Sequence, residues 1–192
     1  MNKSRAKGNN LIVIENGHLS IYVLDDKTEW TVGRPSAGNM PDICLHSTTV
    51  SRRHGRFSCD CGEWMYIDSY GKNGTVYKDK RLEKNKIGFV RPIMLEDKDV
   101  LIFGGGAEPV INGKTVWAMY VTDNVNGEWR VEDTKGMDKM QFIDGDWSEE
   151  VESPGKGTVI DDGNGMAIYM GDLTYLLGDM RVQEYIENVE NV

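Results

Sequence analysis

Short runs of aromatic and β-branched residues, separated every few positions by Gly, Pro, Asn or Asp, fill the first two-thirds of this 192-residue chain. No segment before residue 123 shows helical periodicity over a useful length. This spacing is typical of an antiparallel β-sandwich. We therefore expect an all-β fold whose strands include residues 11–14, 19–24, 29–32, 56–59, 63–67, 76–77, 100–103 and 116–121. Asn16-Gly17, after the first run, predicts a hairpin turn.

Residues 123–192 have a different pattern, with dense Gly, Pro and Asn between short apolar pieces at 140–143 and 166–169. Near the end, one helical face would carry four apolar residues, Leu173, Leu176, Leu177 and Met180. Asp172 precedes them in a position suited to a helix N-cap. We predict an irregular extension that ends in a helix over residues 172–189.

Charge divides the chain at about the same place. Residues 1–122 hold 17 Lys and Arg against 14 Asp and Glu, whereas residues 123–192 hold 5 against 17. The net charge of −9 predicts that the whole molecule repels nucleic acid and anionic membranes at long range, so neither is expected as a partner. Because local charge decides local affinity, the mildly basic first part can still bind a small anion.

The N-terminus and the cysteines favour the cytoplasm. The first ten residues are polar and basic with no apolar run of signal-peptide length behind them, and no stretch approaches the length needed to span a membrane. Three cysteines, at Cys44, Cys59 and Cys61, are an odd number that suits a reducing compartment. Together with His46 they suggest a zinc site, but their spacing is unlike that of common structural zinc sites, so we expect neither a metal nor a cofactor.

Hydrogen-bond donors gather at three predicted strand ends: Gly33-Arg34, Ser51-Arg52-Arg53-His54, and the segment from Asp68 to Asn73-Gly74-Thr75. Guanidinium groups with a hydroxyl suit a phosphate, since the planar fork of arginine matches two phosphate oxygens at once. No catalytic base is paired with a nucleophile in these strings, and His54 alone is more typical of a structural histidine. The pattern predicts a non-catalytic protein that binds phosphate groups.

In this order, and followed by the run Leu95-Glu96-Asp97-Lys98-Asp99-Val100-Leu101-Ile102-Phe103-Gly104, the three strings resemble a forkhead-associated (FHA) domain. The resemblance spans residues 11–122 and implies an FHA/SMAD-like antiparallel sandwich there. Residues 123–192 are then an acidic C-terminal extension of unknown fold. The resemblance also implies a phosphothreonine-peptide binding adaptor that works beside a Ser/Thr kinase. Its partner would be a threonine-phosphorylated protein or peptide.

The same resemblance implies roles for individual residues. Arg34 would hold the phosphate, Ser51 would donate its hydroxyl to it, and Arg52 would offer its amide or side chain. Asn73 would hydrogen-bond the backbone of the peptide.

Four further residues are implied as structural support of the site. Gly33 and Gly74 would permit tight loops, and His54 and Thr75 would brace them.

Two departures from the family pattern affect these expectations. Ser and Thr usually precede Asn-Gly-Thr in the family, where this chain has Gly71 and Lys72. We hypothesise that Lys72 adds a cation beside the phosphate. The usual Asn-Gly after the next strand is replaced by Lys78-Asp79-Lys80, which suits a tight hairpin less well. A phosphate-independent protein–protein scaffold of the same fold is the alternative function.

The acidic extension has a further expected role. It is tethered to a cationic pocket at high effective concentration. Thr134 and Thr158 each lie near acidic residues. If either is phosphorylated, we expect it to fold back and occupy the site.

Overall fold

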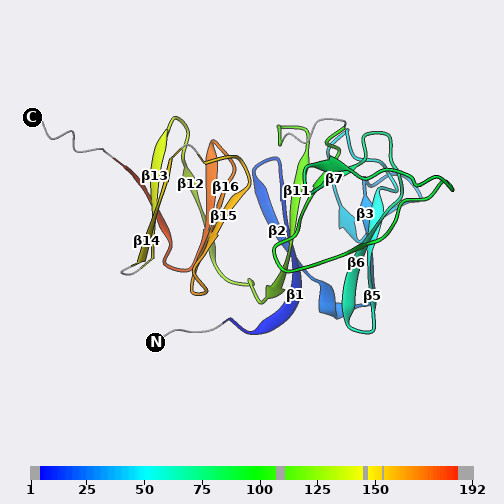
Figure 1. Cartoon of the computed structure of the whole chain (residues 1–192), viewed down its shortest axis with the longest axis horizontal. Helices are drawn as coiled ribbons and strands as arrows, with labels where there is room; N and C mark the ends of the chain where they lie inside the picture. Colours follow the sequence, from blue (N-terminus) through cyan, green and yellow to red (C-terminus); the bar gives the residue numbers. More distant parts are fainter. Residues whose placement is uncertain (1–4, 107–110, 145–146, 153, 186–192) are drawn as a thin grey trace, which may run out of the picture. The chain divides into compact units, whose positions relative to one another are not determined.

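The computed structural model describes residues 5–106, 111–144, 147–152 and 154–185. The chain divides into two compact units, one of Ala6–Asn124 and the other of Val125–Val192 together with Met1–Arg5. Figure 1 colours the strands of the first unit from blue to green and those of the second from yellow-green to red. Among the described residues, no helix has the length and apolar character needed to cross a bilayer.

The described residues of the first unit form eleven strands and one short 3-10 turn, η1 (Leu24–Asp26). The strands are β1 (Lys7–Glu15), β2 (His18–Val23), β3 (Glu29–Gly33), β4 (Ile43–Cys44), β5 (Gly55–Asp60), β6 (Glu63–Asp68), β7 (Thr75–Tyr77), β8 (Lys80–Arg81), β9 (Ile93–Met94), β10 (Val100–Phe103) and β11 (Val116–Asp123). They form a six-stranded sheet, β2-β1-β11-β10-β7-β8, and a five-stranded sheet, β4-β3-β5-β6-β9. All neighbouring pairs are antiparallel except β3 with β4.

The predicted sandwich is confirmed by a core drawn from both sheets. Leu11 and Phe103 of the six-stranded sheet share one buried cluster with Val32, Phe57 and Tyr66 of the five-stranded sheet. The rings of Tyr66 and Phe103 meet across the sheets, with centroids 5.6 Å apart. Alternate residues of each strand point into this layer because the side-chain period of a strand is two. The core therefore fixes the register of the strands whose ends carry the predicted site.

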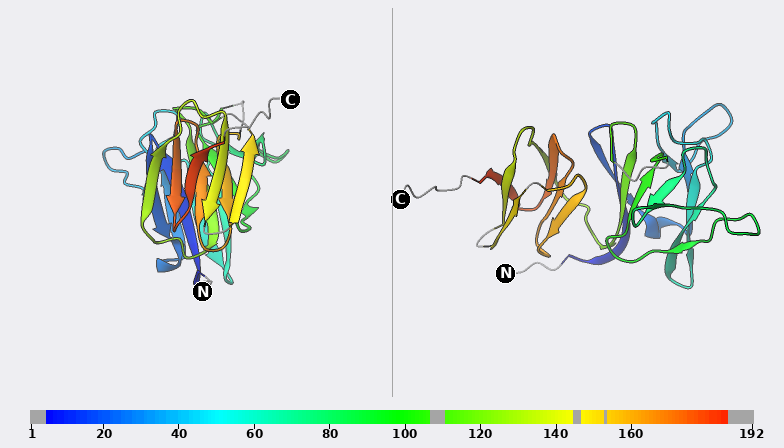
Figure 2. Two further views of the ribbon diagram at one scale, coloured as in Figure 1. Left: turned by 90° about the vertical axis from the view of Figure 1, so that its left-hand side faces the viewer. Right: turned by 45° about the horizontal axis from the view of Figure 1, so that its top comes forward.

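Three hairpins of the first unit turn on two residues, and both central residues of each have positive φ. The turns are Asn16-Gly17, as predicted, with φ of 48° and 77°, Cys61-Gly62 with 49° and 81°, and Lys78-Asp79 with 47° and 60°. This conformation is relaxed for glycine and asparagine and strained for most other residues. Lys78-Asp79 is thus the unfavourable turn that its sequence indicates. The longer connection between β8 and β9 extends beyond the strands in Figures 1 and 2.

The second unit is also built of strands, so the predicted irregular extension is wrong for its described part. The strands are β12 (Trp129–Asp133), β13 (Lys139–Asp144), β14 (Trp147–Glu152), β15 (Thr158–Asp161), β16 (Met166–Tyr169), β17 (Leu173–Leu177) and β18 (Arg181–Glu184). They form a four-stranded sheet, β12-β17-β16-β15, and a three-stranded sheet, β14-β13-β18. Met140 and Phe142 of one sheet pack with Ile160, Ala167 and Leu176 of the other.

The helix predicted over residues 172–189 is wrong for residues 172–185, and the remaining positions lie outside the described residues. Leu173–Leu177 forms β17, an inner strand of its sheet whose last four residues are all buried. A strand buried on both faces is apolar at successive positions, and periodicity alone does not distinguish such a run from a buried helix. Gly178, with φ of +75°, then turns the chain into β18.

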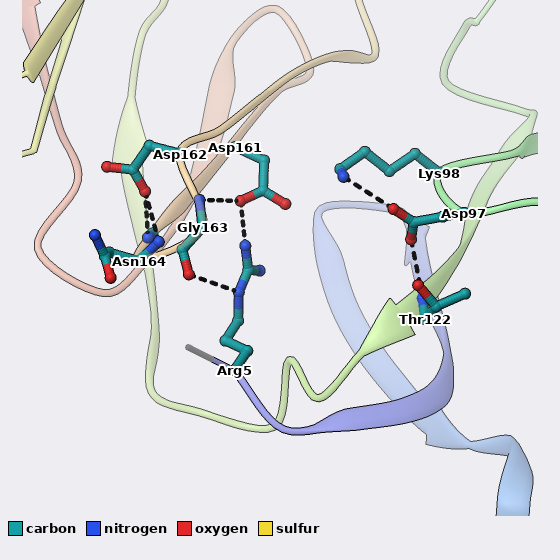
Figure 3. Close-up of polar contacts among 9 residues, drawn as sticks. Arg5, Asp97, Lys98, Thr122, Asp161, Asp162, Gly163 and Asn164 are labelled. Carbon is teal, nitrogen blue, oxygen red and sulfur yellow. Dashed lines mark hydrogen bonds and ion pairs between the residues drawn. The ribbon is translucent and has the colours of Figure 1, made fainter. Parts of the chain in front are cut away.

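Arg5 is fastened to the second unit by the turn after β15, as Figure 3 shows. Its guanidinium forms an ion pair with Asp161 and donates from Nε to the Gly163 carbonyl oxygen at 3.3 Å. In the first unit, the Asp97 carboxylate of the predicted family run accepts the Thr122 amide at 2.9 Å and the Lys98 ammonium at 3.1 Å (Figure 3). Asp97 therefore ties the turn before β10 to the end of β11.

Candidate functional site

Three connections of the first unit meet at the predicted site. Arg34 directly follows β3, Ser51 lies between β4 and β5, and Asn73 lies between β6 and β7. The Arg34 amide donates to the Ser51 carbonyl oxygen at 3.0 Å. Asn73 Nδ2 donates to the Thr49 carbonyl oxygen at 2.9 Å. The two sheets thus hold residues from distant parts of the sequence against one another, through one backbone–backbone bond and one bond from the Asn73 side chain to the backbone.

The side chains of Arg34 and Ser51 have hydrogen-bond donors that few groups of the protein itself accept. The half-buried Arg34 side chain donates only from Nε, to the Val50 carbonyl oxygen at 3.2 Å. Its terminal nitrogens form no ion pair with a carboxylate, and the Ser51 hydroxyl has no hydrogen-bond partner, among the described residues. Because Nε is fixed on the same loop that carries Ser51, the guanidinium fork is oriented before any ligand binds.

Gly33 and Gly71 provide space for close approaches. A Cβ at Gly33 would lie 2.1 Å from the Arg52 carbonyl oxygen, so only glycine lets the Ser51-Arg52 backbone lie beside β3. A Cβ at Gly71 would lie 2.3 Å from Ser51 Oγ. The place where the family usually has a serine side chain is therefore occupied here by the hydroxyl of Ser51.

His54 connects the loops from beneath. The Ser51 amide donates to His54 Nδ1 at 3.1 Å, so Nδ1 is the unprotonated nitrogen and Nε2 carries the hydrogen. Nε2 faces the Gly74 carbonyl oxygen at 3.1 Å and Thr75 Oγ1 at 3.0 Å. Burial lowers the pKa of His54, against weaker opposing effects of the Asp68 carboxylate and the Gly74 carbonyl. A neutral imidazole therefore joins the Ser51 loop to the start of β7.

A buried network continues from Thr75. Its hydroxyl donates to Asp68 Oδ1 at 2.6 Å, and the Tyr66 hydroxyl donates to the same oxygen at 2.9 Å. All three side chains are at most 6% exposed. Burial raises the pKa of the Tyr66 hydroxyl well above its usual value. The second Asp68 oxygen accepts the Tyr70 amide at 3.0 Å, which fixes where the β6–β7 connection leaves its strand.

Arg52 and Lys72 have exposed side chains, and their backbones are the fixed parts. Asn39 Nδ2 donates to the Arg52 carbonyl oxygen at 3.0 Å. Arg81 Nη2 donates to the Lys72 carbonyl oxygen at 3.2 Å. Gly74 has φ of +70° and makes room for Arg81, since a Cβ there would lie 2.6 Å from Arg81 Nε. Both loops are therefore held while their long cations stay in solvent.

Sequence reasoning missed Arg81 and Tyr66, which support the loops from β8 and β6. Arg81 stands in a basic run, and nothing in its spacing shows that it reaches back to residue 72. Tyr66 is one of several strand aromatics, and only the fold places its hydroxyl beside Asp68. Cys44, His46, Cys59 and Cys61 belong to no metal-binding cluster among the described residues, and the three cysteines are free thiols.

The fold and these loops define a β-sandwich module with a cationic site at its strand ends. Residues 30–104 match the family model described as FHA domain. The chain contains an FHA domain, as its sequence pattern predicts. No curated protein matches the chain significantly.

Solved structures similar to this chain are also FHA domains. The first FHA domain of Rv1747 from Mycobacterium tuberculosis is 20% identical, with a TM-score of 0.41, over 59% of this chain and 98% of that one. The FHA domain of CT664 from Chlamydia trachomatis is 18% identical, with a TM-score of 0.46, over 59% and 96%. The FHA1 domain of yeast Rad53 is 20% identical, with a TM-score of 0.45, over 62% and 79%.

Proposed function

We propose that the unit Ala6–Asn124 binds a phosphothreonine peptide. In this proposal Arg34, Ser51 and Arg52 contact the phosphate and Asn73 bonds to the peptide backbone. Lys72 adds a cation beside the phosphate. Gly33, His54, Gly74 and Thr75 keep the loops in position.

One observation carries the proposal. Backbone hydrogen bonds hold Arg34 beside the Ser51 loop, and among the described residues no carboxylate pairs with the Arg34 guanidinium. The Arg34 amide and Nε bond to the carbonyl oxygens of Ser51 and Val50. A phosphothreonine brings about −1.5 to −2 charges and three acceptor oxygens. Each charge-assisted bond to it contributes about 1.5–3 kcal/mol. The site thus offers the donors such a ligand needs and no competing carboxylate among the described residues.

We further propose that the protein is a non-catalytic adaptor in Ser/Thr kinase signalling, located in the cytoplasm. FHA domain membership supports a binding role. The free thiols at Cys44, Cys59 and Cys61 suit a reducing compartment. A threonine-phosphorylated protein is the partner that fits the site, and a Ser/Thr kinase is the class of enzyme that would produce it.

The acidic residues 123–192 are a second proposed ligand, within the same chain. Thr134 is only 1% exposed, and its hydroxyl donates to the Gly171 carbonyl oxygen, so a kinase has no access to it in the folded unit. Thr158 is half-buried at the start of the edge strand β15. We therefore restrict the proposed competition to a phosphorylated Thr158, and we expect Thr158 phosphorylation to weaken binding of an added phosphopeptide. Unchanged affinity would exclude it.

Calorimetry on the full chain tests the main proposal. The probes are a phosphothreonine peptide, its phosphoserine twin and the unphosphorylated peptide. Loss of two charge-assisted bonds in Arg34→Ala predicts an affinity at least about 100-fold lower. Arg56→Ala is the matched control, because Arg56 is an exposed arginine on β5.

Two results would refute phosphothreonine binding. One is equal affinity for all three peptides. The other is an Arg34→Ala protein that binds as tightly as the Arg56→Ala control. Binding of a partner protein unaffected by Arg34→Ala would instead support the phosphate-independent scaffold.

A further inference from the structure

Tyr70 is held in a strained backbone conformation next to the proposed phosphate site. Its φ is +56°, a left-handed value that a side chain with a Cβ disfavours by roughly 1 kcal/mol or more. The bond from its amide to Asp68 Oδ2, at 3.0 Å, keeps the residue there. Glycine would adopt this φ without strain. A tyrosine at this position therefore costs conformational energy that a glycine would not, and the contacts of its side chain can offset this cost.

The Tyr70 ring organises two cations. The Lys84 ammonium lies 4.5 Å from the ring centroid, and the Arg81 guanidinium lies 5.5 Å from it. The Tyr70 hydroxyl donates to Glu83 Oε2 at 3.1 Å, which orients the ring. Glu83 also lies 3.8 Å from Arg81 Nε. The one acidic residue of the cluster is thus engaged by Tyr70 and Arg81 and not by Lys84.

The two cations have different surroundings. Arg81 is half-buried and turns back to the loop of Asn73, where Nη2 donates to the carbonyl oxygens of Lys72 at 3.2 Å and Gly71 at 3.5 Å. Lys84 is exposed and forms no ion pair with a carboxylate among the described residues. Its ammonium therefore keeps donors for a ligand while one side rests against the ring. Through Arg81, this cluster is continuous with the loop that carries Lys72 and Asn73.

From this geometry we infer that Lys84, held over Tyr70, forms a second anion subsite that binds an acidic group flanking the phosphothreonine. The inference rests on the proposed function and names the ligand more closely, as a phosphothreonine segment with a second anionic side chain. That side chain is either a carboxylate or a second phosphate, since both offer oxygens to an ammonium. Lys72, exposed on the same loop, adds to the local positive potential.

Calorimetry with designed peptides on the full chain tests this subsite. The reference peptide has one phosphothreonine in a neutral Ala/Ser background. Two others add three glutamates, either before or after the phosphothreonine, and two more replace these glutamates by a single phosphoserine on the same side. An exposed ion pair of about 1 kcal/mol predicts that one side gives roughly a three- to five-fold gain with glutamates. The second phosphate should give a larger gain because of its greater charge.

Two variants and a control separate the subsite from general electrostatics. Lys84→Met and Tyr70→Leu should bind the reference peptide as the unmodified protein does and lose the gain. Lys86→Met removes an equal charge from an exposed lysine two residues further on and should retain it. A gain with phosphoserine but not with glutamate assigns the subsite to a second phosphate.

Each of three results would overturn the inference while leaving the proposed function intact: no gain in the unmodified protein, a gain that survives Lys84→Met, or an equal loss in Lys86→Met. Failure of every peptide, the reference included, would instead remove the proposed function and the inference with it.

Discussion

Thr75 offers a sharp test of how the site is supported, because its hydroxyl and its methyl group make separable contributions. The side chain is fully buried. The hydroxyl donates to Asp68 Oδ1 at 2.6 Å and lies 3.0 Å from His54 Nε2. Thr75→Val keeps the shape and removes both of these contacts, together with the 3.1 Å contact between the Thr75 and Tyr66 hydroxyls. Thr75→Ser keeps the hydroxyl and removes one methyl group.

We expect Thr75→Val to be less stable than Thr75→Ser, although valine is the more hydrophobic residue. The valine variant loses one bond to a charged acceptor, about 1.5–3 kcal/mol, and part of a neutral bond, about 0.5–1.5 kcal/mol. We expect the free energy of unfolding of the first unit to fall by about 2–4 kcal/mol. The serine variant loses one buried methyl group, about 1 kcal/mol.

Urea denaturation, followed by tryptophan fluorescence and far-ultraviolet circular dichroism, measures both variants. Trp30, Trp64 and Trp117 report on the first unit. The transition of the second unit, which contains Trp129, should not move and serves as an internal control. A valine variant as stable as the serine variant would show that the buried network does not hold the loops as described.

Three further predictions concern other parts of the chain. Asp79→Gly should raise the free energy of unfolding by about 0.5–1 kcal/mol, since Asp79 has φ of 60° in a turn that glycine adopts freely; a lower urea midpoint would contradict this. A hydrogen bond to Asp162 raises the pKa of Asp144 to about 6, so the folded second unit binds this proton more tightly than the unfolded chain. Its stabilising effect should be complete below pH 4 and disappear as the pH rises through about 6, and Asp144→Asn should flatten that dependence in melts across this range. Burial lowers the pKa of His54 below the usual 6.5 of histidine, so the unfolded chain binds this proton more readily and the first unit should lose stability below about pH 6.5; an NMR titration of the His54 ring with a midpoint above 6.5 would refute it.

Local pattern was enough to predict the longer strands of the first unit, whereas the two-residue strands β4, β8 and β9 were not predicted. Apolar and aromatic runs such as 63–67 and 116–121 fall within β6 and β11, and Asn16-Gly17 forms the expected hairpin. These features depend on period and turn chemistry, which are properties of neighbouring residues. The parallel pairing of β3 with β4 was not predicted, because β4 has only two residues and leaves no periodic signal.

The second unit shows where local pattern fails. Leu173, Leu176 and Leu177 fit a helical face on paper, but they belong to an inner strand buried on both sides. Its sheets are made by pairing residues far apart in the sequence, such as Trp129 with Leu177. A single short apolar run does not encode that pairing.

The sequence was enough to predict which residues belong to the candidate site, but not which contacts hold them in place. Arg34, Ser51 and Asn73 stand in a recognisable order, and the structure brings them together through a backbone bond between Arg34 and Ser51 and a bond from the Asn73 side chain to the Thr49 carbonyl oxygen. The supports join residues of different strands and loops nine positions apart: Arg81 reaches Lys72, and Tyr66 reaches Thr75. Such partners are set by the packing of the two sheets, so no spacing rule along the chain identifies them.

The contact between Ser51 and Gly71 has a consequence for how this sequence can evolve. Two positions twenty residues apart share one small volume, because Ser51 Oγ lies 2.3 Å from where a Cβ of residue 71 would be. Any side chain at 71 forces the hydroxyl at 51 to turn away from its present direction. Among descendants of this chain, changes at 71 should therefore appear together with changes at 51 or in its loop. Gly71 leaves the volume that the Ser51 hydroxyl occupies, so each of the two positions limits which side chains the other can carry.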